Sequence, residues 1–109
     1  MGARTPEELE TLLEDAVMLR DVAGLIGLFS PGGILAGPVE HAQGPVHIAR
    51  SARAMLSDGW QYVADPTHVL QAHRTALVIG PHALNVTRRG RDGLWRYEIC
   101  RPGPTLVRP

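Results

Sequence analysis

The chain of 109 residues contains no lysine, so all of its basic side chains are arginines. Eleven arginines are balanced by eleven acidic residues, and the formal net charge is zero when histidine is neutral. A protein without net charge has no overall field to attract nucleic acid or an anionic membrane surface. We therefore expect neither nucleic acid nor a membrane among its partners.

Cysteine occurs only once, at Cys100. A single cysteine excludes a disulfide within the chain and is typical of proteins in a reducing compartment. Acidic residues at Glu7, Glu8 and Glu10 replace the basic start of a signal peptide, and no apolar run approaches the length that spans a bilayer. These absences predict a soluble, cytoplasmic protein. Its length suits one domain over residues 1–109, with tails at 1–4 and 103–109.

Three helices are predicted in the first half of the chain. Residues 5–8 form a capping box with proline at the first helical position, and an apolar stripe continues from there to about Arg20. Asp21 can cap a second, short helix that ends at residues 30–33. A third helix is expected between Gly44-Pro45 and Asp58-Gly59.

Short strands alternate with turns in the rest of the chain. The expected strands are residues 34–36, 39–42, 60–64, 67–73, a long bent strand over 75–86, and 94–101. Gly80-Pro81 is interpreted as a bulge within the long strand, and Asp92-Gly93 supplies the turn before the last one. The order of elements indicates an α+β fold with an antiparallel sheet.

The last strand leaves open which of its faces points inward. Trp95, Tyr97 and Ile99 share one parity and would pack against the helices, which places Glu98 and Cys100 outside. Cys100 is interpreted as a small buried residue rather than as a reactive thiol. Trp60 and Tyr62 are expected in the core or in a pocket wall. The arginines at 88, 89 and 91 are expected to form a solvated hairpin tip.

Five histidines could act as acids or bases near neutral pH. Their spacing suits no metal site, because His68 and His73 are five residues apart and would lie on opposite faces of a regular strand. We therefore expect no metal and no cofactor.

Four motifs in this order resemble the SnoaL-like branch of the nuclear transport factor two-like superfamily, whose relatives include ketosteroid isomerase and polyketide cyclases. They are residues 21–30 (DVAGLIGLFS), 44–48 (GPVHI), 75–78 (TALV) and 92–97 (DGLWRY). The resemblance implies a cone-shaped curved antiparallel sheet wrapped around three helices, a cystatin-like α+β barrel. It also implies a pocket at the open end of the cone and a homodimer formed through the outer face of the sheet.

The resemblance identifies site residues and also departs from the pattern. Gly37 and Leu13 stand where ketosteroid isomerases carry a catalytic Asp and an oxyanion-hole Tyr. His68 matches a pocket histidine of several relatives, and Asn85 matches a second oxyanion donor. The resemblance would also turn Glu98 and Cys100 into the pocket, against the parity argument. As a structural alternative, His68 would be half-buried and bonded to the backbone, and Asn85 would meet solvent on the convex face.

Three functions are compatible with these residues. The first is a cofactor-independent isomerase, cyclase or dehydratase that uses His68 as acid or base and Asn85 as donor. The second is a noncatalytic protein that binds an apolar small molecule, with Trp60, Tyr62, Asn85, Glu98 and Cys100 as its contacts. The third is a dimeric interaction module with a filled cone.

Overall fold

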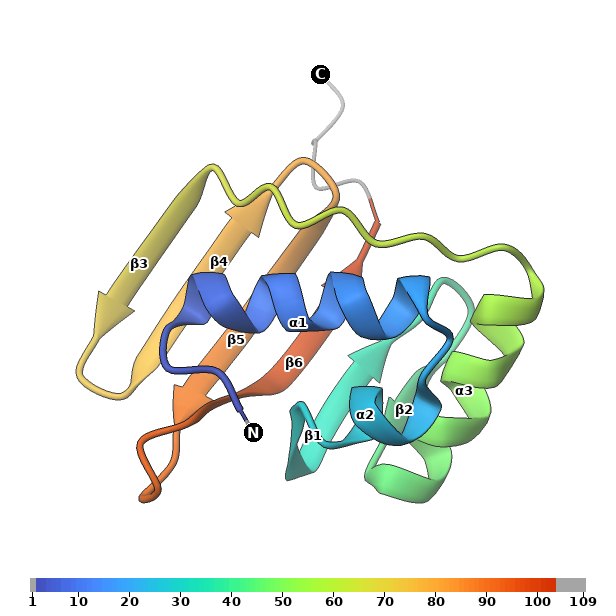
Figure 1. The fold of residues 1–109 in the computed structure, drawn as a ribbon, viewed down its shortest axis with the longest axis horizontal. Helices are drawn as coiled ribbons and strands as arrows, with labels where there is room; N and C mark the ends of the chain where they lie inside the picture. The colour runs from blue at the N-terminus through green and yellow to red at the C-terminus, as the bar shows by residue number, and fades with distance from the viewer. Residues whose placement is uncertain (1, 104–109) are drawn as a thin grey trace.

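A computed structural model describes residues 2–103 as three helices packed on one face of a six-stranded sheet (Figure 1). The elements are α1 (Pro6–Met18), α2 (Val22–Ile26), β1 (Phe29–Ala36), β2 (His41–Gln43), α3 (Pro45–Ser57), β3 (His68–Ala72), β4 (Thr75–Gly80), β5 (Ala83–Arg89) and β6 (Trp95–Pro102). The strands lie in the order β2-β1-β6-β5-β4-β3. The predicted α+β class is confirmed, although β1 and β6 pair in parallel and the sheet is therefore mixed.

Local signals position the helices as the sequence predicts. The Thr5 hydroxyl accepts a hydrogen bond from the Glu8 amide at 3.0 Å, and Asp21 accepts one from the Gly24 amide at 2.9 Å. Helix α3 begins at Pro45 and ends at Ser57. Within residues 2–103, no helix combines the length and the apolar composition needed to cross a bilayer.

Strand β1 begins earlier than predicted, because the second helix ends at Ile26 and Phe29 already pairs with Tyr97. The ladder between β1 and β6 shifts register between Phe29 and Ile34, so residues 30–33 bulge out of the sheet. Gly33 lies at this bulge, where an added Cβ would come within 2.8 Å of the Tyr97 carbonyl oxygen. The glycine is therefore required by close approach of two backbones.

Two strand predictions are wrong. Residues 75–86 form two strands, β4 and β5, joined by a tight turn at Pro81 and His82, so Gly80-Pro81 ends a strand instead of kinking one. Residues 60–64 form no strand but belong to a connection, residues 59–67, that crosses from α3 to β3 (Figure 1). This connection carries Trp60 and Tyr62 over the helix side of the sheet.

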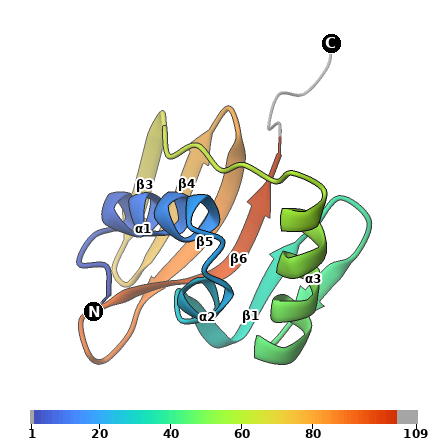
Figure 2. The same ribbon diagram turned by 45° about the vertical axis from the view of Figure 1, so that its right-hand side comes forward.

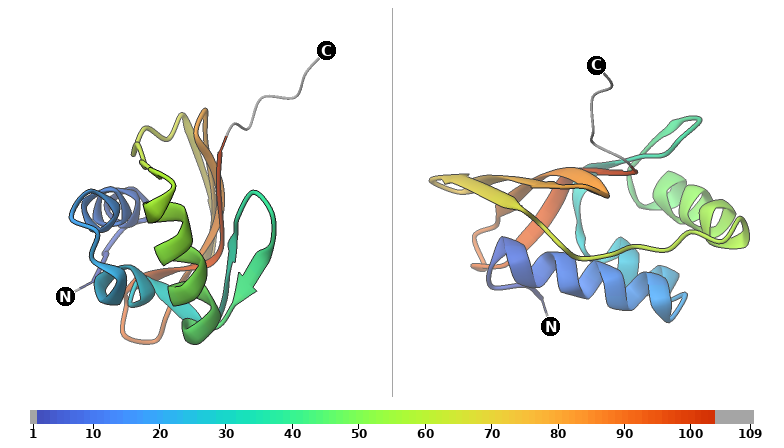
Figure 3. Two further views of the ribbon diagram at one scale, coloured as in Figure 1. Left: turned by 90° about the vertical axis from the view of Figure 1, so that its right-hand side faces the viewer. Right: turned by 90° about the horizontal axis from the view of Figure 1, so that it is seen from above.

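All three helices lie on the same face of the curved sheet, as the side and top views show (Figure 3). We call this the inner face and the opposite one the outer face. Paired residues of neighbouring strands share a face, so the row Val78, Asn85, Cys100, Leu35 and Ala42 faces the helices. The core forms between this row and residues such as Leu9, Leu13 and Ile48, which are fully buried.

A bulge in β6 settles the orientation of the last strand. Val86 pairs with Ile99 and Thr87 with Tyr97, so Glu98 is the extra residue. The bulge reverses the parity, and Tyr97 and Cys100 both face inward while Ile99 faces outward with 40% of its surface exposed. The prediction that Trp95, Tyr97 and Ile99 share one face is therefore wrong at Ile99.

Ala3, within the predicted tail of residues 1–4, packs into the fold. Ala3 forms an isolated antiparallel bridge with Trp95 and is fully buried. The Trp95 amide donates to the Ala3 carbonyl at 2.8 Å. Of the predicted C-terminal tail, residues 104–109 lie outside the described residues.

Candidate functional site

Four polar side chains meet in the apolar interior between α1 and the sheet. They are Glu10 from α1, Tyr62 from the connection 59–67, Asn85 from β5 and Tyr97 from β6, and we call them the polar cluster. None of the four is more than 5% exposed. Figure 2 shows α1 on the helix-covered side of the sheet, and the hydrogen bonds bring the four positions together.

The Glu10 carboxylate is the centre of the polar cluster. Its Oε1 accepts from the Tyr62 hydroxyl at 2.6 Å, and its Oε2 accepts from the Tyr97 hydroxyl at 2.6 Å and from Asn85 Nδ2 at 2.8 Å. Three donors on two oxygens are the partners that an ionised carboxylate requires, since it can only accept. A buried charge is tolerated when it is bonded in this way.

Asn85 connects the polar cluster to the sheet. Its Nδ2 also donates to the Tyr62 hydroxyl at 2.9 Å, and its Oδ1 accepts from the Arg101 backbone amide at 3.0 Å. Among the described residues, no buried side-chain oxygen or nitrogen is left without a partner. The arrangement therefore fixes the direction of every hydrogen bond around Glu10.

Burial keeps the neighbouring groups neutral. It raises the pKa of both tyrosines above their usual value, and the nearby Glu10 carboxylate raises it further. Burial likewise raises the pKa of the Cys100 thiol, with Glu10 adding to the shift. The tyrosines are consequently proton donors and not bases, and Cys100 is not a reactive thiolate.

The sequence of α1 carries a signal for Glu10, because this acidic residue lies on the apolar stripe of the helix. Buried positions of α1 include Leu9, Leu13, Ala16 and Val17, and Glu10 lies three residues before Leu13 on that same stripe. An acid on the apolar face of an amphipathic helix needs a buried partner. Tyr97 was assigned to the core, and nothing local indicated that its hydroxyl meets Glu10.

His68 and Asn85 lie on opposite faces of the sheet. His68 pairs with Ile79 and Ile79 with Leu84, whereas Asn85 pairs with Val78. The His68 side chain is exposed on the edge strand β3. The structure therefore does not bring His68 to the polar cluster, and neither the buried nor the backbone-bonded arrangement expected for it is seen.

The other predicted contacts divide into two groups. Tyr62 and Asn85 belong to the polar cluster, and Cys100 is the cross-strand partner of Asn85. Trp60 is half-buried and meets the Tyr62 ring edge-on, with ring centroids 6.5 Å apart. Glu98 is half-buried at the β6 bulge, and no hydrogen bond joins it to the polar cluster.

An open groove of about 400 Å³ leads from the surface to Tyr62, and we call it the mouth groove. It lies between the end of α1 and the connection 59–67. Its lining includes Glu14, Val17, Trp60, Tyr62 and Val63. The groove thus reaches Tyr62, the one member of the polar cluster in its lining, through a wall of apolar and polar side chains.

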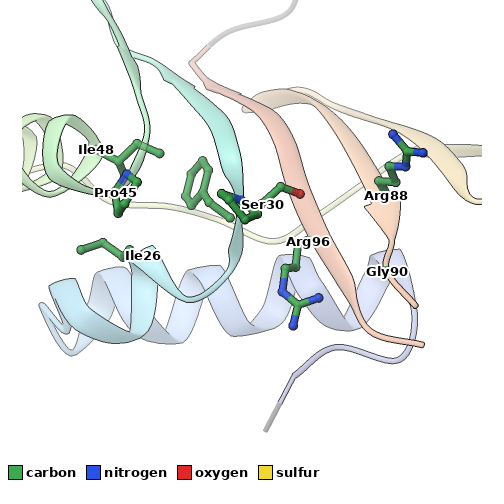
Figure 4. Close-up of a pocket in the computed structure, with 9 residues that line it drawn as sticks. Ile26, Ser30, Pro45, Ile48, Arg88, Gly90 and Arg96 are labelled. Atoms are coloured by element: carbon green, nitrogen blue, oxygen red, sulfur yellow. The ribbon is translucent and has the colours of Figure 1, made fainter. Parts of the chain in front are cut away.

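A second groove, of about 540 Å³, lies between α2, the start of α3 and the β5–β6 hairpin. In Figure 4, Ile26, Pro45 and Ile48 stand at one end and Arg88 at the other, with Arg96 between them. Arg96 is held by an ion pair with Asp92 at 2.7 Å. This groove contains none of the residues predicted for the site.

The Asp92–Arg96 ion pair is expected to make the stability of the protein depend on pH. Hydrogen bonds from Arg96 lower the pKa of Asp92 from 3.8 to about 2, so the pair stabilises the fold above about pH 4 and is lost as pH falls toward 2. We expect Asp92→Asn to lower the melting temperature at pH 6, and we expect most of this difference from the wild type to be gone at pH 2. A difference that persists unchanged at pH 2 would contradict this linkage.

Comparison with known proteins supports the fold. No protein-family profile and no curated protein matches the chain. Among solved structures, a ketosteroid isomerase-like protein from Erwinia carotovora atroseptica superimposes with a TM-score of 0.78 at 17% identity, covering 93% of this chain and 94% of the other.

Two further solved structures have a similar fold. A candidate association domain of calcium/calmodulin-dependent protein kinase type II from Thiobacillus denitrificans has a TM-score of 0.79 at 19% identity, with 97% and 99% of the two chains covered. A candidate dehydratase of the NTF2-like family from Streptomyces avermitilis has a TM-score of 0.70 at 19% identity, with 92% and 93% covered. The chain thus has the fold of NTF2-like and ketosteroid isomerase-like proteins, as its motifs predicted.

Proposed function

We propose that this protein binds a small, mainly apolar molecule between α1 and the sheet, and that the polar cluster holds the one oxygen-bearing group of that molecule. The observation that carries the proposal is the buried Glu10 carboxylate, ringed by three donors in an otherwise apolar interior. A few convergent polar groups in an apolar site are typical of small-molecule pockets. The mouth groove supplies the route from solvent.

Thermal shift with a panel of small phenols, alcohols and ketones tests this proposal, followed by titration of any compound that binds. Glu10→Gln is expected to weaken binding at least tenfold, since a charged hydrogen bond contributes roughly 1.5–3 kcal/mol. Glu7→Gln is the matched control, because it makes the same change on the exposed side of α1. Equal affinity in the wild type and in folded Glu10→Gln would contradict the proposal.

A second candidate function is proton transfer next to a carbonyl group. The polar cluster holds both requirements: a carboxylate that can take a proton from carbon, and donors at Tyr97 and Asn85 for the oxygen that becomes an enolate. One of the similar structures is a candidate dehydratase of the NTF2-like family, which is compatible with such chemistry. The electrons of the broken C–H bond form a carbon–carbon double bond, the π electrons of the carbonyl group move to its oxygen, and Glu10 carries the proton.

Exchange of ketone α-hydrogens for deuterium, followed by NMR, tests this reaction. Glu10→Gln is expected to slow the exchange by roughly a hundredfold or more, in the range of general base catalysis. His68→Ala is expected to leave the rate unchanged, because His68 lies on the outer face. A rate that depends on His68 and not on Glu10 would restore the histidine mechanism.

We also propose that two copies of the chain associate through the outer face of the sheet. An apolar row crosses five strands there, because Leu70 pairs with Leu77, Leu77 with Val86, Val86 with Ile99 and Ile99 with Ile34. No helix covers this face in Figure 3. An apolar row that faces solvent on an uncovered sheet face marks an interaction surface, and a second copy offers the same row.

Val86→Arg tests the dimer, because it places a charge at the centre of the row. We expect the wild type to elute as a dimer in light-scattering chromatography and Val86→Arg as a monomer. Val39→Arg is the control, since Val39 is 94% exposed in the loop between β1 and β2. A monomeric wild type would contradict this assignment. A cytoplasmic location also belongs to the proposal, and the lone free thiol of Cys100 is compatible with it.

A further inference from the structure

We propose that Tyr62 is a built-in plug whose phenol occupies the position of the ligand, and that the ligand is a flat compound with a phenol or enol hydroxyl. The ligand displaces Tyr62 when the connection 59–67 moves outward. This inference rests on the proposed function, because it specifies the ligand class and the access step of the same site.

Tyr62 is the one member of the polar cluster that comes from an irregular segment. Glu10, Asn85 and Tyr97 lie on α1, β5 and β6, whereas residues 60–67 have no helix or strand structure. Yet the Tyr62 side chain is only 5% exposed, and its hydroxyl reaches Glu10 Oε1 at 2.6 Å. The helix and the strands thus form the receptor, and the irregular segment supplies the group bound in it.

The connection is anchored at its ends. The Trp60 amide donates to the Met55 carbonyl at 2.9 Å, and the Thr67 amide donates to the Ile79 carbonyl at 2.8 Å. Between them, the Ala64 amide makes a long contact of 3.4 Å with Glu14. Gly59 has a φ of +87°, a backbone conformation that other residues adopt at a cost. Tyr62 is therefore the principal polar anchor of the middle of the connection.

Open space flanks the connection on both sides. The mouth groove touches Trp60, Gln61, Tyr62 and Val63 on one side. A further groove of about 440 Å³ touches Trp60, Gln61 and Val63 on the other, next to Met55 and His82. The backbone of residues 60–63 thus lies between two open grooves, and only the Tyr62 side chain reaches from it into the polar cluster.

The hydrogen bonds of the Tyr62 hydroxyl define the ligand chemistry. The oxygen donates a proton to Glu10 and accepts one from Asn85 Nδ2, so a replacing atom must do both. A ketone oxygen cannot donate and an ammonium group cannot accept, whereas a phenol or an enol does both. The aromatic ring of Tyr62 sets the shape of the space as flat and apolar. Because an enol is the tautomer of a ketone, the same site favours the enol form of a carbonyl compound.

The experiment removes the Tyr62 side chain by mutation and adds p-cresol, which is the same side chain as a free molecule. Tyr62→Ala is expected to bind p-cresol, with a rise in melting temperature of about 10 °C at a hundredfold excess over Kd. Toluene, which lacks the hydroxyl, is expected to bind at least tenfold more weakly. Trp95→Ala is the matched control, because it removes a buried ring that belongs to neither the polar cluster nor the mouth groove, and it should not respond to p-cresol.

A folded Tyr62→Ala protein that shows no response to p-cresol, or binds toluene equally well, overturns the inference. If Tyr62→Ala folds only in the presence of p-cresol, the inference is supported. If it does not fold at all, amide exchange in Tyr62→Phe decides. Loss of the hydroxyl should speed exchange of residues 61–66 at least tenfold, and unchanged exchange would refute the plug.

The experiments distinguish failure of the Tyr62 plug from failure of the proposed small-molecule binding. If Tyr62→Ala ignores p-cresol while the wild type binds a compound in a Glu10-dependent manner, the plug is refuted and the proposed function stands. If Tyr62→Ala binds p-cresol but no compound in the panel binds the wild type, the plug geometry stands and the proposed function is refuted.

Discussion

Glu10→Ala is expected to lower the free energy of unfolding by about 3 kcal/mol or more. The substitution leaves two tyrosine hydroxyls and one amide without their acceptor in a buried site, and each unsatisfied buried group costs roughly 1–3 kcal/mol. Tyr62 and Asn85 keep each other as partners, so the three costs do not add in full. Urea denaturation followed by circular dichroism measures the change.

Glu7→Ala provides the comparison for this result. Glu7 lies in the first turn of α1 with an exposed side chain, so only its interaction with the helix terminus is lost, at most about 1 kcal/mol. Equal destabilisation of the two variants would show that Glu10 is not the centre of a buried network.

Tyr97→Ala is expected to cost about 3–5 kcal/mol, the range for removing a large aromatic side chain from a core. Tyr97 is fully buried, and its ring lies 5.5 Å from the Phe29 ring, measured between centroids. Since the whole stability of a domain of this size is roughly 5–15 kcal/mol, this variant will be close to unfolding.

Tyr97→Phe separates the hydroxyl from the ring. It keeps the packing against Phe29 and loses the 2.6 Å hydrogen bond to Glu10, so we expect a smaller loss of about 1.5–3 kcal/mol. If Tyr97→Phe were as stable as the wild type, the Tyr97 hydroxyl would contribute nothing to holding the buried carboxylate.

The elements that sequence reasoning predicted well are those with local causes. The caps at Thr5 and Asp21 and the hairpin turn at Asp92-Gly93 act within a few residues, and each appears as expected. The composition of residues 60–64, with Trp, Tyr and Val, predicted a strand that the structure does not contain. That segment instead runs over the inner face, and Tyr62 binds a carboxylate 52 residues away.

Faces of strands were harder to predict, because a bulge has no strong sequence signature. The extra residue at Glu98 reverses the parity of β6, so Tyr97 and Cys100 both point inward. The parallel pairing of β1 with β6 joins segments some 65 residues apart and was also not foreseen. Asn85 was predicted as a site residue through the family resemblance, and it does face the interior.

The polar cluster itself could not be assembled from the sequence, because its members meet only in the folded chain. Glu10 is separated by 75 residues from Asn85 and by 87 from Tyr97. The one usable signal was an acid on the apolar stripe of α1. A buried carboxylate requires donors, and Asn85 and Tyr97 lie on strands, whereas Tyr62 lies in an irregular connection that no strand pattern indicates.

The central claim is that the polar cluster is the ligand site. The most direct test is to titrate the ¹⁵N-labelled protein with a phenol or ketone that binds it and to follow the amide signals by NMR. We predict the largest shift changes at the Asn85 side-chain amide and at the Arg101 backbone amide, which donates to Asn85 Oδ1. Changes confined to the groove of Arg88 and Arg96, with the Asn85 and Arg101 signals unmoved, would contradict a ligand site at the polar cluster.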